Sequence, residues 1–503
     1  MKHAAGLVVY VIRQQIGIIM AFSTPFKFIA AGAVLTAATI GASVVFTGNG
    51  PSAWFTASAA PAPHGHTHTD ALQLGEEDQT LLLALLRSQR SGDKTQLLAE
   101  LDQRWSPAYV APALEIYNFI PDPALRGALL NNLKATTGQD FGQDINGWYR
   151  WLWNQPEVKV AGYDNFKAKF YSAIDPRFAR YFKDRGANSQ IRLDEIRWGG
   201  VRQDGIPPLR QPKMISAEEA DYLGDDNIVF GIEVNGDVRA YPKRILAWHE
   251  MFVDTVGGQD LAGIYCTLCG FFVLYDTQAG GLSHEVGTSG FLYRSNKLMY
   301  DKATQSLWNT IKGEPVLGPL VGKDIALTHH SVVTTTWGEW KRRHPKSQVL
   351  SLDTGFKRDY GEGVAYHEYF STDTLMFNTP YSDQRLNNKD EVLALRFRNS
   401  PHDQLAISAD YLKKNPLFAD KVGQQNVLVV TDKTGGNRVY DPKDIVFKSY
   451  DGDSQLTDEA GRRWMLTESK LIDTDGRELK RLPYNRAFWF GWHATYPNSR
   501  LIK

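Results

Sequence analysis

The two cysteines of this chain, Cys266 and Cys269, are separated by two residues within the segment IYCTLCGFFVLYD. In thioredoxin-like proteins such a pair opens a helix. Here β-branched and aromatic residues follow the second cysteine, and the glycine pair Gly280-Gly281 comes after them, which predicts a strand, a tight turn and a second strand. Gly270 suits that turn because glycine tolerates a positive φ. The region around the cysteines is therefore expected to be a β-hairpin.

Two thiolates on a glycine-closed hairpin turn are the sulfur ligands of a zinc knuckle. They supply only half of a tetrahedral site, so a histidine would have to complete it. The same pair can instead exchange a disulfide with a partner. It can also simply brace the hairpin, either as a disulfide or as two reduced thiols. The spacing alone leaves all of these uses open.

His249 is the favoured third metal ligand, because it lies seventeen residues before Cys266 at the end of a predicted short helix. Its neighbour Glu250 is a candidate for a further ligand, for orienting a ligand or for acting as a general base. His284 and Asp301 are weaker candidates, since a lone histidine is more often structural and an aspartate often caps a turn. Copper and zinc are the metals that suit this mixture of sulfur and nitrogen donors.

Composition excludes one large class of partner. The chain has 503 residues, of which 43% are apolar, which is enough for roughly two to four domains with their own cores. Its 56 basic and 56 acidic residues balance, so no surface of one sign is implied and no nucleic acid is expected as a partner. The 13 tryptophans and 22 tyrosines fit β-rich layers.

An apolar segment near the N-terminus predicts a membrane anchor or an export signal. Residues 28–46 carry no charge, and Lys27 precedes them. At about 1.5 Å per residue they span about 28 Å, close to the hydrocarbon thickness of a bilayer. Because the flanking charges before Asp70 are all basic, residues 1–27 are expected in the cytoplasm, with residues 28–47 as the transmembrane anchor or signal segment. The bulk of the chain then lies on the periplasmic, extracytoplasmic side of the cell membrane, where a disulfide can form.

The rest of the chain divides by its sequence patterns. Residues 48–74 read as a linker rich in Pro and Ala, and residues 75–190 carry leucines at helical spacing that predict a bundle of short helices. A β-rich α+β unit containing the cysteine turn is expected over residues 191–370, and a second, degenerate unit over residues 371–503. Within the first unit, Asn235-Gly236 between two alternating runs predicts a hairpin.

The two α+β units are expected to be copies, because each ends in the same pattern. W-x-x-W-x4-P-x4-[L/I] begins at Trp337 in the first unit and at Trp489 in the second, with the other elements in a matching order. In the second unit a predicted strand over residues 426–431 replaces the strand before the cysteines, and Thr434-Gly435-Gly436 replaces the thiols. The expected fold class is α+β: an anchor or signal, a helical bundle, and tandem duplicated β-rich units.

Five segments together resemble the bacterial family catalogued as domain of unknown function 3179: WGGVRQDGIPPL, NGDVRAYPKRILAWHE, YCTLCG, GTSGFLYRSNKLMYDKATQSLWNT and TTTWGEWKRRHP. The resemblance covers roughly Arg192 to Lys503. It implies an exported protein of this duplicated architecture, with Cys266 and Cys269 as the functional pair and with no established reaction. The usual knuckle of the family is similar to YCPLCG, and Thr267 replaces its proline here.

Three functions follow as alternatives. In the leading one, an exported, membrane-anchored protein binds copper or zinc through Cys266, Cys269 and His249. The second is a thiol–disulfide oxidoreductase in which Cys266 attacks a partner and Cys269 resolves the mixed disulfide. In the third, the chain is a non-catalytic binding or scaffold protein with structural cysteines. The sequence leaves open whether the chain is an enzyme, and whether a protein or a small molecule is its partner.

Overall fold

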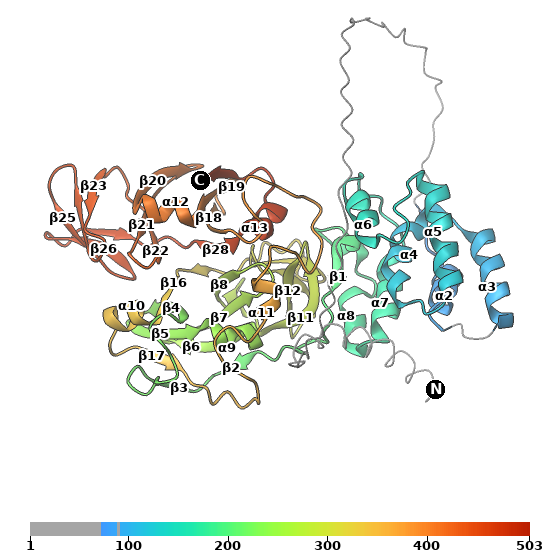
Figure 1. The fold of residues 1–503 in the computed structure, drawn as a ribbon, viewed down its shortest axis with the longest axis horizontal. Coiled ribbons are helices and arrows are strands. Elements are labelled where there is room, and N and C mark those ends of the chain that lie inside the picture. Colours follow the sequence, from blue (N-terminus) through green and yellow to red (C-terminus); the bar gives the residue numbers. More distant parts are fainter. Residues whose placement is uncertain (1–71, 88–90) are drawn as a thin grey trace, which may run out of the picture.

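The computed structural model describes residues 72–87 and 91–503. A helical region comes first and several β-sheets follow it, so the chain is a mixed α+β protein, as predicted (Figure 1). The predicted anchor over residues 28–47 lies outside the described residues. Among the residues that are described, no helix has the length and apolar character needed to cross a membrane.

Helices with local sequence signals form the N-terminal region. In α5, the Asp122 side chain accepts hydrogen bonds from the backbone N–H groups of Ala124 (2.8 Å) and Leu125 (3.2 Å), which caps the first turn. Gly138, with φ 69°, ends this helix in the left-handed conformation that glycine favours. The helices are α2 (Glu76–Ala84), α3 (Ser91–Arg104), α4 (Val110–Ile116), α5 (Pro123–Thr137), α6 (Ile145–Trp153), α7 (Tyr163–Ser172) and α8 (Ala179–Phe182), with 3-10 turns at Pro107–Tyr109, Tyr117–Phe119, Pro176–Phe178, Gly186–Asn188 and Leu193–Glu195.

A buried polar cluster joins the helical region to the first strand. Glu115 accepts hydrogen bonds from Lys167 (2.5 Å), Tyr163 (2.7 Å) and Tyr171 (2.5 Å). The Lys167 ammonium also donates to the Ile196 carbonyl of β1 at 2.9 Å. Burial lowers the pKa of Lys167, against the attraction of Glu115. The helices are thus attached to the β-rich part by a satisfied charge pair as well as by apolar packing.

Two five-stranded sheets form much of the first β-rich unit. One has the antiparallel order β1 (Ile196–Trp198), β11 (Val286–Tyr293), β12 (Asn296–Asp301), β13 (Leu307–Asn309), β14 (Glu314–Leu317). The other has the order β16 (Val333–Thr336), β4 (Ile228–Val234), β5 (Asp237–Pro242), β17 (Gln348–Leu350), β3 (Met214–Ser216). The predicted hairpin is confirmed, since β4 and β5 meet through Asn235 (φ 50°) and Gly236 (φ 82°).

A nine-stranded sheet runs through both predicted units. Its order is β2 (Leu209–Arg210), β6 (Met251–Val256), β7 (Gln259–Cys266), β8 (Phe271–Asp276), β28 (Asn485–Phe488), β18 (Glu391–Phe397), β19 (Ser400–Ser408), β29 (Arg500–Ile502), and β15 (His329–His330) pairs with β8 outside this path. The strand after the cysteines, β8, pairs with β28 near the C-terminus through Phe272 and Arg486. This pairing brings the end of the chain beside the cysteine turn.

The two halves of the β-rich part share one strand pattern. β16-β4-β5-β17 and β28-β18-β19-β29 each contain two antiparallel pairings followed by a parallel one. Each path also carries a helix before its last strand: α10 (Trp337–Arg343) and α13 (Trp489–Thr495). In both, a tryptophan indole N–H donates to a serine hydroxyl at 2.9 Å, from Trp340 to Ser347 and from Trp492 to Ser499.

The remaining elements complete the second half and the connections. The sheets are β20 (Leu417–Val422), β21 (Gln425–Thr431), β22 (Asn437–Tyr440), then β23 (Phe447–Tyr450), β24 (Gln455–Asp458), β25 (Arg463–Leu466), β26 (Lys470–Asp473), β27 (Glu478–Lys480), with β9 (Gln278–Ala279) paired to β10 (Leu282–Ser283). The helices are α9 (Lys243–His249), α11 (His367–Phe370) and α12 (Ala409–Lys414).

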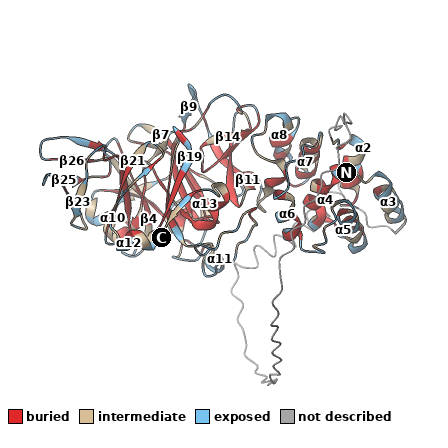
Figure 2. Cartoon of the chain, turned by 90° about the horizontal axis from the view of Figure 1, so that it is seen from above, coloured by how far each residue is buried: buried red, intermediate tan, exposed pale blue. Residues whose placement is uncertain are grey.

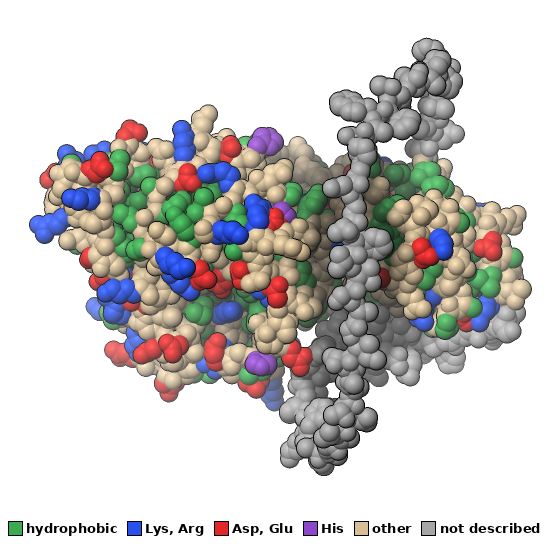
Figure 3. Space-filling view, turned by 45° about the horizontal axis from the view of Figure 1, so that its top comes forward, with side chains coloured by type: hydrophobic (Ala, Val, Ile, Leu, Met, Phe, Trp, Pro, Cys, Tyr) green, Lys and Arg blue, Asp and Glu red, His purple; other side chains and the backbone are tan. Residues whose placement is uncertain are grey.

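Buried residues fill the interior of these layers (Figure 2). On the face seen in Figure 3, basic and acidic side chains are interspersed over the β-rich part.

Candidate functional site

The two cysteines lie in the turn between β7 and β8, which confirms the predicted strand, turn and strand. β7 ends at Cys266, whose backbone register partner is Phe271 at the start of β8. Gly270 has φ 58°, and a side chain there would also lie within 2.9 Å of the Phe488 ring. Glycine therefore meets two needs at this position, a left-handed backbone and close packing against β28.

Cys266 and Cys269 form a disulfide, with their Cα atoms 5.6 Å apart. Both residues are buried: 1% of Cys266 and none of Cys269 is exposed. They belong to an apolar core that includes Phe488, Trp489 and Trp492 from β28 and α13. The pair thus lies where the two halves of the β-rich part meet.

A buried ion pair contacts the turn between the two cysteines. The Thr267 hydroxyl donates to Glu250 Oε1 at 2.7 Å. Glu250 Oε2 lies 2.8 Å from Lys297 Nζ, and both side chains are more than nine-tenths buried. Tyr366 donates a further hydrogen bond to Glu250 Oε1 at 3.2 Å. Each oxygen of this carboxylate thus has a partner in the low-dielectric interior, where an unpaired charge would be costly.

Residues far along the chain cover the turn. The Tyr369 hydroxyl donates to the Leu268 carbonyl at 2.6 Å. On the other side, the Phe488 backbone N–H donates to the Cys269 carbonyl at 2.8 Å. A Cβ placed on Gly491 of α13 would lie only 2.6 Å from the Cys269 Cβ, so only glycine allows this helix to approach so closely. Cys269 is therefore packed directly against α13.

Both ring nitrogens of the predicted ligand His249 have other partners. Its Nδ1 lies 2.9 Å from the Pro207 carbonyl, and its Nε2 lies 2.5 Å from the Tyr360 hydroxyl. Burial lowers the pKa of His249, which favours the neutral ring. Helix α9 ends at His249, and the next residue, Glu250, has a left-handed backbone with φ 55°. The structure therefore brings Glu250 to the cysteine turn and engages His249 elsewhere.

The other two predicted residues form a pair with each other. His284 Nδ1 lies 3.0 Å from Asp301 Oδ2, and both side chains are buried. The second ring nitrogen of His284 lies 3.1 Å from the Ala279 carbonyl. Asp301 also accepts the backbone N–H of Thr304 at 2.7 Å, which matches the capping role considered from the sequence. These contacts connect β12 to its neighbouring loops.

Within residues 72–87 and 91–503, no group of three or more His, Cys, Asp or Glu side chains is arranged to hold a metal ion. Metal binding by Cys266, Cys269 and His249 thus stays a prediction. Sequence reasoning missed Lys297, although a lysine within the apolar segment of β12 was a usable signal. It also missed Tyr369 and Gly491, for which the local sequence gives no signal.

The second half has a different turn at the matching place. Between β21 and β22, the Asp432 carboxylate accepts the backbone N–H groups of Thr434 (3.0 Å) and Gly436 (2.9 Å). It also accepts a hydrogen bond from Arg438 at 2.9 Å. A carboxylate that organises its own turn therefore lies here, where the first half has the disulfide.

A protein-family profile described as protein of unknown function (DUF3179) matches residues 203–499. This match confirms the resemblance drawn from the five sequence segments. No curated protein and no solved structure matches the chain.

Proposed function

We propose, from the premise that this chain belongs to the DUF3179 family of proteins of unknown function, that Cys266 and Cys269 are a redox-active pair that exchanges a disulfide with a partner protein. One observation carries the proposal. The residue between the two cysteines, Thr267, is hydrogen-bonded to the buried Glu250–Lys297 ion pair. A disulfide and a buried charge pair thus share one turn.

A purely bracing disulfide would contribute less stability at this spacing than one that closes a longer loop. A disulfide stabilises a protein mainly by restricting the unfolded chain, and a loop of about four residues corresponds to about 2 kcal/mol in that description. The cysteines are only three positions apart. β7 and β8 are already paired along their length, from Leu261 with Asp276 to Cys266 with Phe271. The hairpin is therefore held by backbone pairing as well as by the cross-link.

The buried ion pair also favours a functional turn. Burying an ammonium and a carboxylate gives little net stability, because their desolvation offsets their attraction. We assign Glu250 as a positioning residue: it holds Thr267, and through it the turn, while Lys297 balances its charge.

The proposed step starts from the reduced pair. The Cys266 thiolate attacks one sulfur of a partner's disulfide, the partner's S–S bond breaks, and the departing sulfur takes up a proton. Cys269 then loses its proton and attacks Cys266 Sγ in the mixed disulfide, which releases the partner's second thiol. The partner gains two electrons and two protons, and the chain ends in the disulfide form. Both cysteines are buried, so the turn must open before a partner's disulfide reaches Cys266. We assign the first attack to Cys266 because the Cβ of Cys269 is packed against Gly491 of α13.

Trapping the mixed disulfide tests this order. We expect the reduced full-length Cys269→Ser chain to retain one glutathione per molecule after incubation with oxidised glutathione, because the resolving thiol is missing. Mass spectrometry before and after dithiothreitol measures the adduct. The matched control is Cys266→Ser, whose remaining Cys269 is packed directly against Gly491 and should form much less adduct. Equal adducts in the two variants, or none in either, would contradict the assigned roles.

Copper or zinc binding by the reduced pair ranks second. It needs two thiolates and a third donor, and both ring nitrogens of the proposed donor His249 already have partners. A metal complex would therefore require His249 to leave Pro207 and Tyr360. Metal analysis of the reduced chain, and of its Cys266→Ser variant, separates this proposal from disulfide exchange. The scaffold alternative requires that loss of both cysteines leave function intact.

We further infer that residues 191–370 and 371–503 are copies of one α+β unit. The matching strand order and the two Trp–Ser hydrogen bonds support this inference. We also propose that residues 28–47 anchor or export the chain, so that the cysteine pair works on the extracytoplasmic side of the membrane. There an oxidising environment retains the disulfide that the exchange leaves, so a reducing thiol partner must return the pair to its reduced form before another exchange.

A further inference from the structure

A small cavity lies where the helical region meets the first β-rich unit. It has a volume of about 50 Å³ and is lined by α6, by Arg197 of β1, by the β11–β12 turn at Arg294-Ser295, and by the loop around Asn378. Met376 belongs to the same wall and is 46% exposed, so this wall borders solvent. We call this space the junction cavity. It has no part in the cysteine chemistry described above.

Hydrogen-bond donors without partners line the junction cavity. Ser295 is only 3% exposed, and its hydroxyl has no hydrogen-bond partner. The Asn378 side-chain nitrogen is buried and also lacks a partner. A native protein seldom leaves such groups unsatisfied, because each one costs the loss of its hydrogen bonds to water. Their position at one cavity indicates a ligand that accepts hydrogen bonds.

The cavity lining also contains a cation, Arg197, that has no ion-pair partner among the described residues. The Arg197 guanidinium stacks on the Tyr149 ring, with its carbon 3.5 Å from the ring centroid. Among the described residues it forms no side-chain hydrogen bond or ion pair. Glu195, the acidic residue of the lining, is already held by Arg294 at 2.5 and 3.2 Å. The positive charge of Arg197 is therefore left for a ligand.

We propose that the junction cavity binds a carboxylate, either a formate- or acetate-sized molecule or the acidic end of a larger one. Stacking leaves the edge of the Arg197 guanidinium free, and that planar fork matches the two oxygens of a carboxylate. Ser295 and Asn378 donate to the same group. A volume of about 50 Å³ holds such a head group. The rest of a longer molecule would extend out of the cavity past Met376.

The proposal gives the helical region a role. The family match begins at residue 203, so Arg197 and the wall formed by α6 lie outside it, whereas Ser295 and Asn378 lie inside it. The site is complete only where the two parts meet. A carboxylate bound there stabilises that junction in addition to occupying the cavity.

Isothermal titration of the full-length chain with sodium formate and sodium acetate, against sodium chloride of equal ionic strength, tests the site. We expect saturable binding of one carboxylate per chain. Arg197→Gln should weaken it at least about tenfold, as expected for the loss of a charged hydrogen-bond pair. Ser295→Ala should weaken it in the same direction. The matched control is Arg180→Gln, because Arg180 is an exposed arginine of α8 outside the cavity lining.

Three outcomes would overturn the proposal. The first is no saturable binding of either carboxylate to the wild-type chain, in which case the cavity holds water. The second is unchanged affinity in both Arg197→Gln and Ser295→Ala. The third is tighter binding of inorganic phosphate than of any carboxylate, which would assign the cavity to a different anion. Circular dichroism of each variant establishes that it is folded before the titration is interpreted.

Discussion

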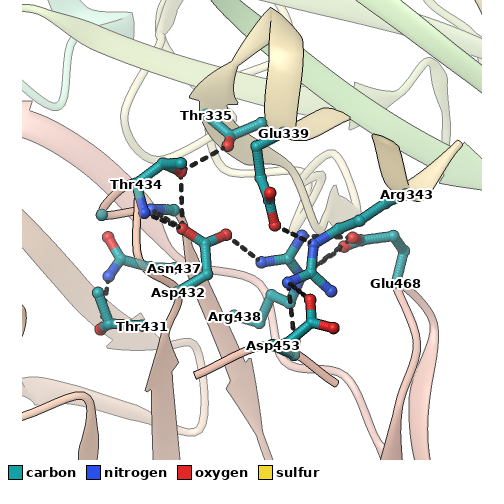
Figure 4. Close-up of polar contacts among 12 residues, drawn as sticks. Thr335, Glu339, Arg343, Thr431, Asp432, Thr434, Asn437, Arg438, Asp453 and Glu468 are labelled. Atoms are coloured by element: carbon teal, nitrogen blue, oxygen red, sulfur yellow. Dashed lines mark hydrogen bonds and ion pairs between the residues drawn. The ribbon is translucent and has the colours of Figure 1, made fainter. Parts of the chain in front are cut away.

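Replacing Arg438 with methionine is expected to lower the free energy of unfolding by about 3–5 kcal/mol, because it leaves buried carboxylates without their counter-charge. Arg438 is only 1% exposed. Its guanidinium donates to Asp432 at 2.9 Å and to Glu468 at 2.6 Å (Figure 4). A neighbouring hydrogen bond links the two halves of the β-rich part, since the hydroxyl oxygens of Thr335 and Thr434 lie 3.1 Å apart. Losing this arginine therefore weakens the junction of the halves as well as β22.

Urea denaturation of the wild-type and Arg438→Met chains measures the loss. The matched control is Arg398→Met, which removes an ion pair with Asp324 in which both partners are more than half exposed. A surface pair of this kind contributes less than about 1 kcal/mol. An Arg438→Met chain as stable as the Arg398→Met chain would contradict the description of the buried network.

The same network predicts a dependence on pH. Burial alone would raise the pKa of Glu468, but Arg438, His344 and Arg481 together outweigh it and hold this pKa well below its usual range. A carboxyl group with a lowered pKa in the folded state contributes stability above its unfolded pKa, and that contribution is lost as the pH falls. We expect wild-type stability to drop on acidification below the ordinary pKa of a glutamate. Without Arg438 this drop should be smaller.

Replacing Lys297 with methionine is the second change with a large expected effect. It leaves the Glu250 carboxylate buried beside the cysteine turn without its partner at 2.8 Å, and breaking a buried pair in this way costs about 3–5 kcal/mol. Because Glu250 holds Thr267, we also expect altered reactivity of the cysteine pair. Chemical denaturation gives the stability, and the rate at which the disulfide is reduced by dithiothreitol gives the reactivity.

A double variant serves as the control for Lys297. Glu250→Gln combined with Lys297→Met removes both charges, so the chain should regain much of the stability lost by Lys297→Met alone. The altered disulfide reactivity should persist, because neither variant retains the wild-type Glu250–Lys297 ion pair beside the turn. A double variant no more stable than Lys297→Met would show that the cost has a different origin from the unpaired carboxylate.

Local sequence signals predict the elements that the site is built on. The Cys-x-x-Cys-Gly segment predicts the β7–β8 turn, and Asn235-Gly236 predicts the β4–β5 hairpin, because each turn is set by residues within it. The W-x-x-W pattern marks α10 and α13, which occupy the same place in two matching strand paths. Each of these features is determined by residues close together in the chain, so a local sequence pattern is enough to predict it.

Partners distant in the sequence could not be predicted. His249 and Glu250 are adjacent, but successive side chains of a helix point about 100° apart at 3.6 residues per turn, and the positive φ of Glu250 ends α9 there. Only one of the two therefore reaches the turn. Tyr369 and Gly491 reach it from elements that follow much later in the chain. Their contacts follow from the pairing of β8 with β28, which no local pattern specifies.

The reduction potential of the Cys266–Cys269 disulfide tests the central claim most directly. The full-length chain would be equilibrated in dithiothreitol redox buffers, trapped with an alkylating reagent and quantified by mass. Redox activity predicts a potential above about −300 mV, in the range of thiol oxidoreductases, and a structural cross-link lies below it. A potential below that limit would contradict the proposed exchange and would make the disulfide a structural element of the hairpin.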